Sequence, residues 1–134
     1  MDIQTFDQHT RHLETDIMLE SAGISLRVMR IPAHGSQSIQ HSHDFQELVV
    51  ILSGHGKHEI GTDVYDIEAG DVFVILGDTT HGFTKTENLS LINILFDPDQ
   101  LRIPRSDIGN LPGYHALFTI EPQLRAIGRY RNHL

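Results

Sequence analysis

The chain has 134 residues and a mass of 15.1 kDa, which is the size of one domain, and its net charge is −8. Its acidic balance argues against a nucleic-acid or anionic-membrane surface, and the absence of cysteine excludes disulfides and thiolate metal sites. No run approaches the roughly 18 apolar residues that span a membrane, and the polar N-terminus lacks a signal-peptide core, so we expect a cytoplasmic protein without membrane contact.

The first part of the chain, residues 1–22, is weakly patterned, and we interpret it as an N-terminal arm. Residues 5–20 can form a short helix within this arm.

A first strand is predicted at residues 24–31, where apolar and polar side chains alternate and Pro32 follows. The alternation has period two, so one set of side chains faces the core. We expect Leu26 and Val28 to face the core and Arg27 to face solvent.

The most informative stretch is residues 35–54, where two histidines one residue apart precede a carboxylate and an apolar run. His41 and His43 leave the same face of a strand, so both rings can reach one metal ion. Glu47 shares that parity, but six residues of straight strand span ~20 Å at about 3.3 Å each. The chain must therefore bend at residues 44–46 if Glu47 is to join the histidines. A fourth ligand has to come from elsewhere in the fold.

Turn signals recur every several residues after this stretch and divide the chain into short strands. Seven to nine such strands predict an antiparallel sandwich or barrel, which we place at residues 23–98. The strands are expected at residues 48–52, 57–60, 64–67, 72–76, 82–86 and 90–96, with turns at 53–56, 61–63, 68–71 and 87–88.

The tail, residues 99–134, changes character to an irregular connection followed by helices. One helical turn is expected after Pro112, before Pro122. A second helix is expected to carry an apolar stripe that either forms a dimer contact or packs on its own barrel, and that helix is unfinished where the chain stops. We therefore expect an N-terminal piece of a longer protein. The stripe consists of Leu124, Ile127, Tyr130 and Leu134.

The candidate for the fourth ligand is His81, which follows an apolar strand and a Gly-Asp-Thr-Thr loop. At this point the sequence resembles the cupin family. The resemblance implies an all-β fold, a cupin-like antiparallel barrel or jelly roll, here with a C-terminal helical segment. The first cupin motif is Gly, five residues, His-x-His, three or four residues, Glu, six residues and Gly, and it is matched without a gap by Gly35, His41, His43, Glu47 and Gly54.

The second cupin motif is matched less fully. Gly70 and His81 stand where the family has them. The family's usual Pro, Gly and Asn are replaced by Leu76, Asp78 and Lys85. These departures fall in the loop and beyond it, and they leave the four metal-ligand positions intact.

The chain also resembles the N-terminal sensing domain of AraC-type transcription regulators, particularly the rhamnose-responsive kind. The similar stretches lie between residues 24 and 127 and include HSHDFQELVVILSGHGKHEIGTDVYDIEAGDVFVI, NILFDPDQL and LPGYHALFTIEPQLR. The resemblance implies a barrel that binds a small sugar-like effector, helices that form a homodimer, and a DNA-binding domain that is not present in this chain. Such a fragment senses and dimerises but does not touch DNA, which agrees with its acidic charge.

The site has two interpretations. His41, His43, Glu47 and His81 either hold a divalent transition metal, with Zn, Ni, Fe, Mn and Cu all suited to three imidazoles and a carboxylate, or line a sugar pocket without an ion. Asn93 interrupts an apolar strand and either contacts the effector or hydrogen-bonds a neighbouring strand. Phe83 either lines the pocket or belongs to the core. Scaffold roles are expected for His34, His55, His58 and His115.

Two functions follow from these readings. The first is the effector-sensing and dimerisation domain of a transcription regulator, which is not an enzyme and has no catalytic residue. The alternative is a stand-alone metal-dependent cupin enzyme, an isomerase or a dioxygenase, in which the ligand set leaves coordination positions open.

Overall fold

The computed structural model describes residues 11–13, 25–35, 40–77, 79–101 and 110–120. These residues form one seven-stranded sheet and a short C-terminal helical segment, so the predicted all-β architecture is confirmed. The strands are β1 (Arg11–Leu13), β2 (Leu26–Ile31), β3 (His41–His43), β4 (Gln46–Ile60), β5 (Asp63–Glu68), β6 (Val72–Ile75) and β7 (His81–Phe96), and the helix α3 (Pro112–His115) continues into a π-helical turn, η2 (Ala116–Ile120).

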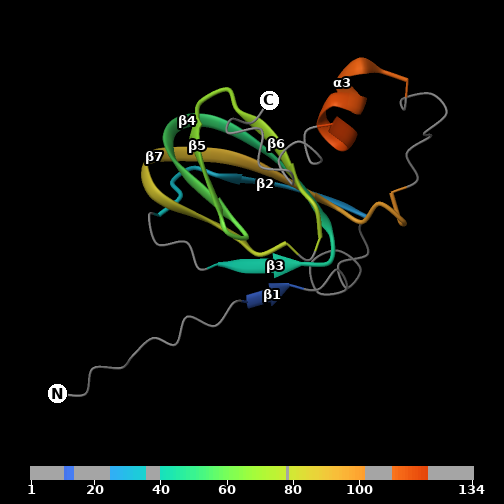
Figure 1. Cartoon of the computed structure of the whole chain (residues 1–134), viewed down its shortest axis with the longest axis horizontal. Coiled ribbons are helices and arrows are strands. Elements are labelled where there is room, and N and C mark those ends of the chain that lie inside the picture. The colour runs from blue at the N-terminus through green and yellow to red at the C-terminus, as the bar shows by residue number, and fades with distance from the viewer. Residues whose placement is uncertain (1–10, 14–24, 36–39, 78, 102–109, 121–134) are drawn as a thin grey trace.

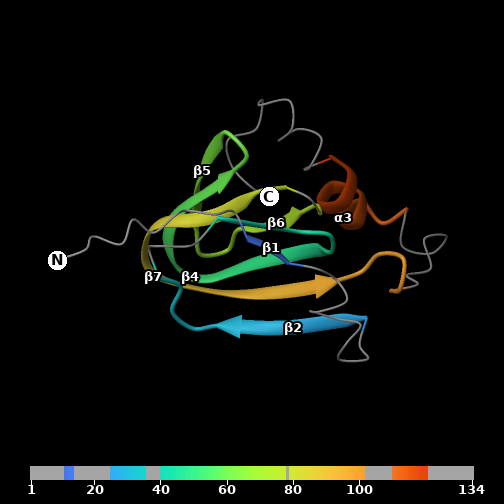
Figure 2. The same cartoon turned by 90° about the horizontal axis from the view of Figure 1, so that it is seen from below.

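Strands β4 and β7 form the axis of the sheet, and Figures 1 and 2 show them running side by side. They pair antiparallel from Gln46 opposite Phe96 to Ile60 opposite His81. On the far side of β7 lie β2 and β3, both antiparallel to it, while β5 and β6 pair with β4. The two long strands therefore carry most of the candidate site residues on one continuous ladder.

Both long strands continue through positions where the sequence predicted turns, at residues 53–56 and 87–88. The register instead shifts between Ile51 and Lys57, which marks β-bulges in the ladder. Gly54 has φ +75°, and a Cβ there would overlap the backbone carbonyl of Asn88. The prediction of turns was wrong because the glycines bend a paired strand and let its neighbour approach, and do not reverse the chain.

The inward face of β2 is the opposite of the predicted one. Leu26 and Val28 are 41% and 59% exposed, whereas Met29 and Ile31 pack against the core. Because side chains alternate, Arg27 shares the inward parity of Met29 and Ile31, although it is itself exposed. The alternation was real, but apolar residues occupy both of its phases, and only the pairing with β7 decides which phase faces the interior.

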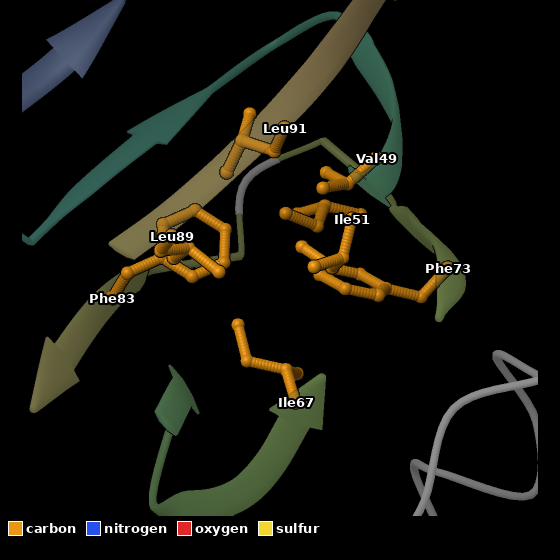
Figure 3. Packing of buried hydrophobic residues seen from close by; sticks show 8 residues of the cluster. Val49, Ile51, Ile67, Phe73, Phe83, Leu89 and Leu91 are labelled. Carbon is orange, nitrogen blue, oxygen red and sulfur yellow. The ribbon is translucent and has the colours of Figure 1, made fainter. Parts of the chain in front are cut away.

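The main core cluster draws buried side chains from four strands, and Figure 3 shows them pointing toward one another. It contains Phe83, so the structure places this residue in the core, as one of the two sequence readings expected. The ring of Phe83 also packs against the imidazoles of His34 and His58. The cluster consists of Val49, Ile51, Ile67, Phe73, Ile75, Phe83, Leu89 and Leu91.

The segments flanking the barrel are described in part. Arg11–Leu13 form a strand that pairs in parallel with β3, so the helix expected across residues 5–20 is wrong at these three positions. The helical turn expected after Pro112 is confirmed as α3, which begins with that proline. The predicted apolar stripe at residues 124–134 lies outside the described residues.

The C-terminal segment lies beside β6 in Figures 1 and 2, and it also contacts the last residue of β7. Phe118 of η2 packs edge-on against Phe96 with ring centroids 6.1 Å apart, and Tyr114 stacks on Phe118 at 4.7 Å. Within the part of the chain that the structure describes, no helix has the length and apolar character needed to cross a membrane.

Candidate metal centre

The first two candidate ligands lie on β3, and their common parity turns both toward the interior. The strand ends at His43, the chain bends at Asp44 and Phe45, and β4 begins at Gln46. The predicted bend is therefore present, and it brings Glu47 back beside the histidines. His41 lies directly opposite His81 in the pairing of β3 with β7, so this pairing brings the fourth candidate ligand beside the first.

The four predicted ligands converge. His41, His43, Glu47 and His81 each offer one ligand atom, and these atoms all lie within 4.8 Å of one another. Oε2 of Glu47 is 3.0 Å from Nε2 of His43 and 3.6 Å from Nε2 of His81. Both of these histidines are fully buried, and Glu47 is 3% exposed. The arrangement is a compact set of nitrogen and oxygen donors in which His43, Glu47 and His81 are buried and His41 is half-buried.

Backbone carbonyls orient two of the imidazoles. Nδ1 of His43 donates to the carbonyl oxygen of Phe45 at 2.7 Å, and Nδ1 of His81 donates to that of Thr79 at 3.0 Å. A proton on Nδ1 leaves Nε2 as the lone-pair nitrogen, which is the usual arrangement behind a metal-ligating histidine. In both rings it is Nε2 that faces the Glu47 carboxylate.

The contacts of His43 imply a positive charge at the centre. Its ring faces an oxygen acceptor at each nitrogen, Phe45 O on one side and Glu47 Oε2 on the other. A neutral imidazole carries one N–H and can donate to one of them. The second contact therefore needs either an additional proton or a cation between Nε2 and the carboxylate.

Glu47 is held in its charged form. Burial raises the pKa of its carboxyl, but the hydrogen bond with His43 and the nearby imidazoles of His43 and His81 outweigh burial and lower the pKa from 4.5 to about 2. A buried carboxylate that stays ionised is a ligand ready for a cation.

The residues present fit a divalent transition metal. Nε2 of His81 is buried and has no hydrogen-bond partner among the described residues, which a metal bond would explain. Three imidazoles and a carboxylate are donors that Zn, Ni, Fe, Mn and Cu accept, and the set leaves further coordination positions open.

The loop before His81 departs from the family motif and still packs closely. A Cβ on Gly77 would lie 3.1 Å from the carbonyl oxygen of Asp44, so a residue without a side chain lets this loop lie against the β3–β4 bend. Asp78 lies outside the described residues. Lys85, at the motif position of Asn, has φ +48°, a conformation that Asn adopts more readily than Lys.

Two further polar side chains lie near the four candidate ligands. Asn93 lies on β7 opposite Val49 of β4 and shares the parity of the buried Leu91 and Leu95. His58, which the sequence suggested as scaffolding, is fully buried with its ring centroid 6.0 Å from that of His81. The bulges in β4 lie between Glu47 and His58 and change which face of the strand His58 is on. The number of residues between Glu47 and His58 therefore did not predict that His58 lies near the four candidate ligands.

The fold and this centre define the class of protein. Residues 27–95 match the family described as Cupin domain, and the chain belongs to the cupin family. Among solved structures it is similar to a conserved protein of unknown function from Streptococcus pyogenes, with TM-score 0.50 and 23% identity, covering 55% of this chain and 66% of that one. A cupin protein from Bacteroides fragilis aligns with TM-score 0.47 and 23% identity, covering 58% of this chain and 69% of that one.

Sequence comparison points to a particular kind of cupin. The chain is similar to the HTH-type transcriptional activator RhaR of Escherichia coli strain K12 and of Shigella flexneri serotype 5b (strain 8401), with 36% identity over 77 residues in each case. The match covers 58% of this chain and 27% of each relative, so it spans about a quarter of their length. The predicted resemblance to a regulator of this type is confirmed over the cupin region.

Proposed function

We propose that this chain is the effector-sensing part of an AraC-type transcription regulator and that it binds a small sugar-like ligand beside a metal ion. The observation that carries the proposal is the convergence of four potential ligands inside a barrel that is 36% identical to part of RhaR. His41, His43, Glu47 and His81 would hold the ion, which when bound supplies Lewis-acid character at the centre.

The protein's own residues would provide the rest of the ligand site. Asn93 and Phe83 are the two further residues that we propose as ligand contacts. Phe83 is buried in the core cluster, so its contribution would be an apolar wall, whereas Asn93 offers a polar group on the inner face. Ligand binding would change the packing of the flanking segments only through its differential affinity for their alternative arrangements.

The division of labour along the chain is also part of the proposal. Residues 1–22 would serve as an arm, residues 23–98 as the sensing barrel, and residues 99–134 as the connection and the start of helices that form a homodimer. DNA binding would belong to sequence outside these residues, as the name HTH-type transcriptional activator implies for the relatives. The regulator would act in the cytoplasm.

Metal analysis tests the centre directly. We would purify the protein without a metal-affinity column and measure Zn, Ni, Fe, Mn and Cu beside a His43→Ala variant. Near-stoichiometric metal in the wild type and its loss from a still folded variant would support metal-assisted binding. A metal-free wild type would contradict it and would leave the four residues as hydrogen-bonding lining of a sugar pocket.

The alternative is a metal-dependent cupin enzyme, an isomerase or a dioxygenase, and the observation that favours it is the complete ligand set. Four protein donors with open positions are also what substrate coordination requires. The two functions differ in their response to a bound sugar. A sensor returns the sugar unchanged after overnight incubation with the metal-loaded protein, whereas an isomerase yields a new sugar that NMR detects.

A further inference from the structure

Asn93 carries a polar atom that the described part of the chain leaves without a hydrogen-bond partner. Its Oδ1 is buried and has no hydrogen-bond partner among the described residues. Burying a carbonyl oxygen without a partner costs folding free energy, and most such atoms in proteins are paired. Leucine has a similar volume and would avoid that cost. An amide at this position therefore calls for a partner outside the described residues, and a bound molecule can supply one.

The sheet register places Asn93 next to the metal centre. It lies directly opposite Val49, and its neighbour two residues along the same face, Leu95, lies directly opposite Glu47. Asn93 is therefore the diagonal neighbour of Glu47 on the inner face, at a distance of about 7–8 Å between Cα atoms. A small molecule that reaches Glu47 and its histidine neighbours can reach Asn93 as well.

The surroundings of Asn93 are otherwise apolar. It is flanked on β7 by the buried Leu91 and Leu95, and on either side by Met29 of β2 and Val49 of β4. No hydrogen bond from these side chains can satisfy an amide oxygen, because they carry no N–H or O–H donor. The amide of Asn93 thus has apolar side chains directly beside it on the sheet and the proposed metal centre at its diagonal, which suits it to fixing the orientation of a bound molecule.

A buried polar residue on the same strand, Ser90, behaves differently. The hydroxyl of Ser90 lies 2.7 Å from that of Ser53 on β4, so this pair hydrogen-bonds across the ladder. The polar side chain of Ser90 thus has its hydrogen-bond partner within the sheet. Ser90 is therefore a matched control for Asn93 in a test of whether the side chain stabilises the fold.

We propose that Asn93 determines ligand specificity by accepting a hydrogen bond from a hydroxyl group of the effector bound beside the metal centre. The inference rests on the proposed sensing function and deepens it. Oδ1 is an acceptor, so it selects a molecule that presents a donor at this position and rejects one of the same shape that presents hydrogen there. The ligand class is then a hydroxyl-bearing molecule with one hydroxyl group directed at β7.

The first test needs no ligand. In the purified protein, Asn93→Leu is expected to leave the thermal midpoint unchanged or to raise it, because the substitution removes an unsatisfied oxygen. Ser90→Ala, which breaks a satisfied pair, is expected to lower the midpoint by roughly 2–5 °C. A drop for Asn93→Leu as large as that for Ser90→Ala would show that the amide is scaffold, and would overturn the proposal whether or not a sugar binds.

The second test uses L-rhamnose and its singly deoxygenated derivatives as probes, with affinities measured by calorimetry on the metal-loaded protein. One derivative is expected to bind the wild type at least about tenfold more weakly than rhamnose, and that penalty is expected to disappear in Asn93→Leu. Equal penalties in both proteins would assign the lost hydroxyl to another residue and overturn the specificity role. Failure of rhamnose to bind the wild type would count against the proposed function, while the thermal test still decides the status of Asn93.

Discussion

The ring of His43 is held by one residue in two ways. It stacks on the ring of Phe45 with centroids 4.1 Å apart and an interplanar angle of 8°, and its Nδ1 donates to the carbonyl oxygen of the same residue. Phe45 in turn packs with Leu95 and Met29. The bend between β3 and β4 thus fixes both the tilt and the tautomer of a proposed metal ligand.

Replacing Phe45 with Leu is expected to weaken metal binding about tenfold or more, because the stacking surface is lost while the backbone carbonyl remains. Competition with a chromophoric chelator would measure the zinc dissociation constant. Phe73→Leu is the matched control, since Phe73 is equally buried and stacks on His58, which is not one of the four proposed metal ligands. Equal zinc affinities in the two variants would contradict the orienting role of Phe45.

The stability of the metal-free protein is expected to fall in acid because of Glu47. Its pKa is about 2 in the folded protein and 4.5 ordinarily, so between these values the unfolded chain binds more protons. The contribution, on the order of 3 kcal/mol, is present above about pH 5 and is lost as the pH falls toward 2. Urea unfolding at several pH values in EDTA would measure it.

The variant Glu47→Gln tests this assignment, since it cannot titrate. Its unfolding free energy should change less with acidification than that of the wild type, whereas Glu87→Gln, an exposed control, should retain the full dependence. If wild type and Glu47→Gln lose stability in parallel, other carboxylates govern the acid response.

Alanine at Gly54 is expected to cost roughly 3–5 kcal/mol of unfolding free energy, because it combines a positive φ with overlap on the Asn88 carbonyl. Gly61→Ala has a positive φ but open space around the new Cβ, so its cost is expected to be about 1 kcal/mol. Urea denaturation measures both. Similar losses would mean that the bulge adjusts and that close approach does not require glycine at 54.

Metal addition is expected to stabilise the protein through the proposed centre. Zinc at a hundred times its dissociation constant should add about 2.7 kcal/mol, which raises the thermal midpoint by several degrees. His81→Ala should abolish the rise. His55→Ala, which removes an exposed histidine of β4, should leave it intact. A rise that survives His81→Ala would place the zinc elsewhere.

The sequence by itself was enough for the local half of the site. The period of two on a strand put His41 and His43 on one face, and the reach of an extended chain required the bend that the structure has at Asp44 and Phe45. The hairpin between β4 and β5 and the helical turn after Pro112 were equally readable. All of these depend on residues within a few positions of one another, where backbone geometry leaves few choices.

Other features were decided by strand pairing alone. The inward face of β2, the bulged continuity of β4 and β7, and the proximity of His58 and Asn93 to the centre all follow from which residues lie opposite one another across the sheet. Periodicity states that side chains alternate but not which phase faces the interior, and the glycines of a bulge that shifts the phase cannot be told in the sequence from the glycines of a turn. Only the folded sheet fixes the register, because register is set by burying one whole face at once.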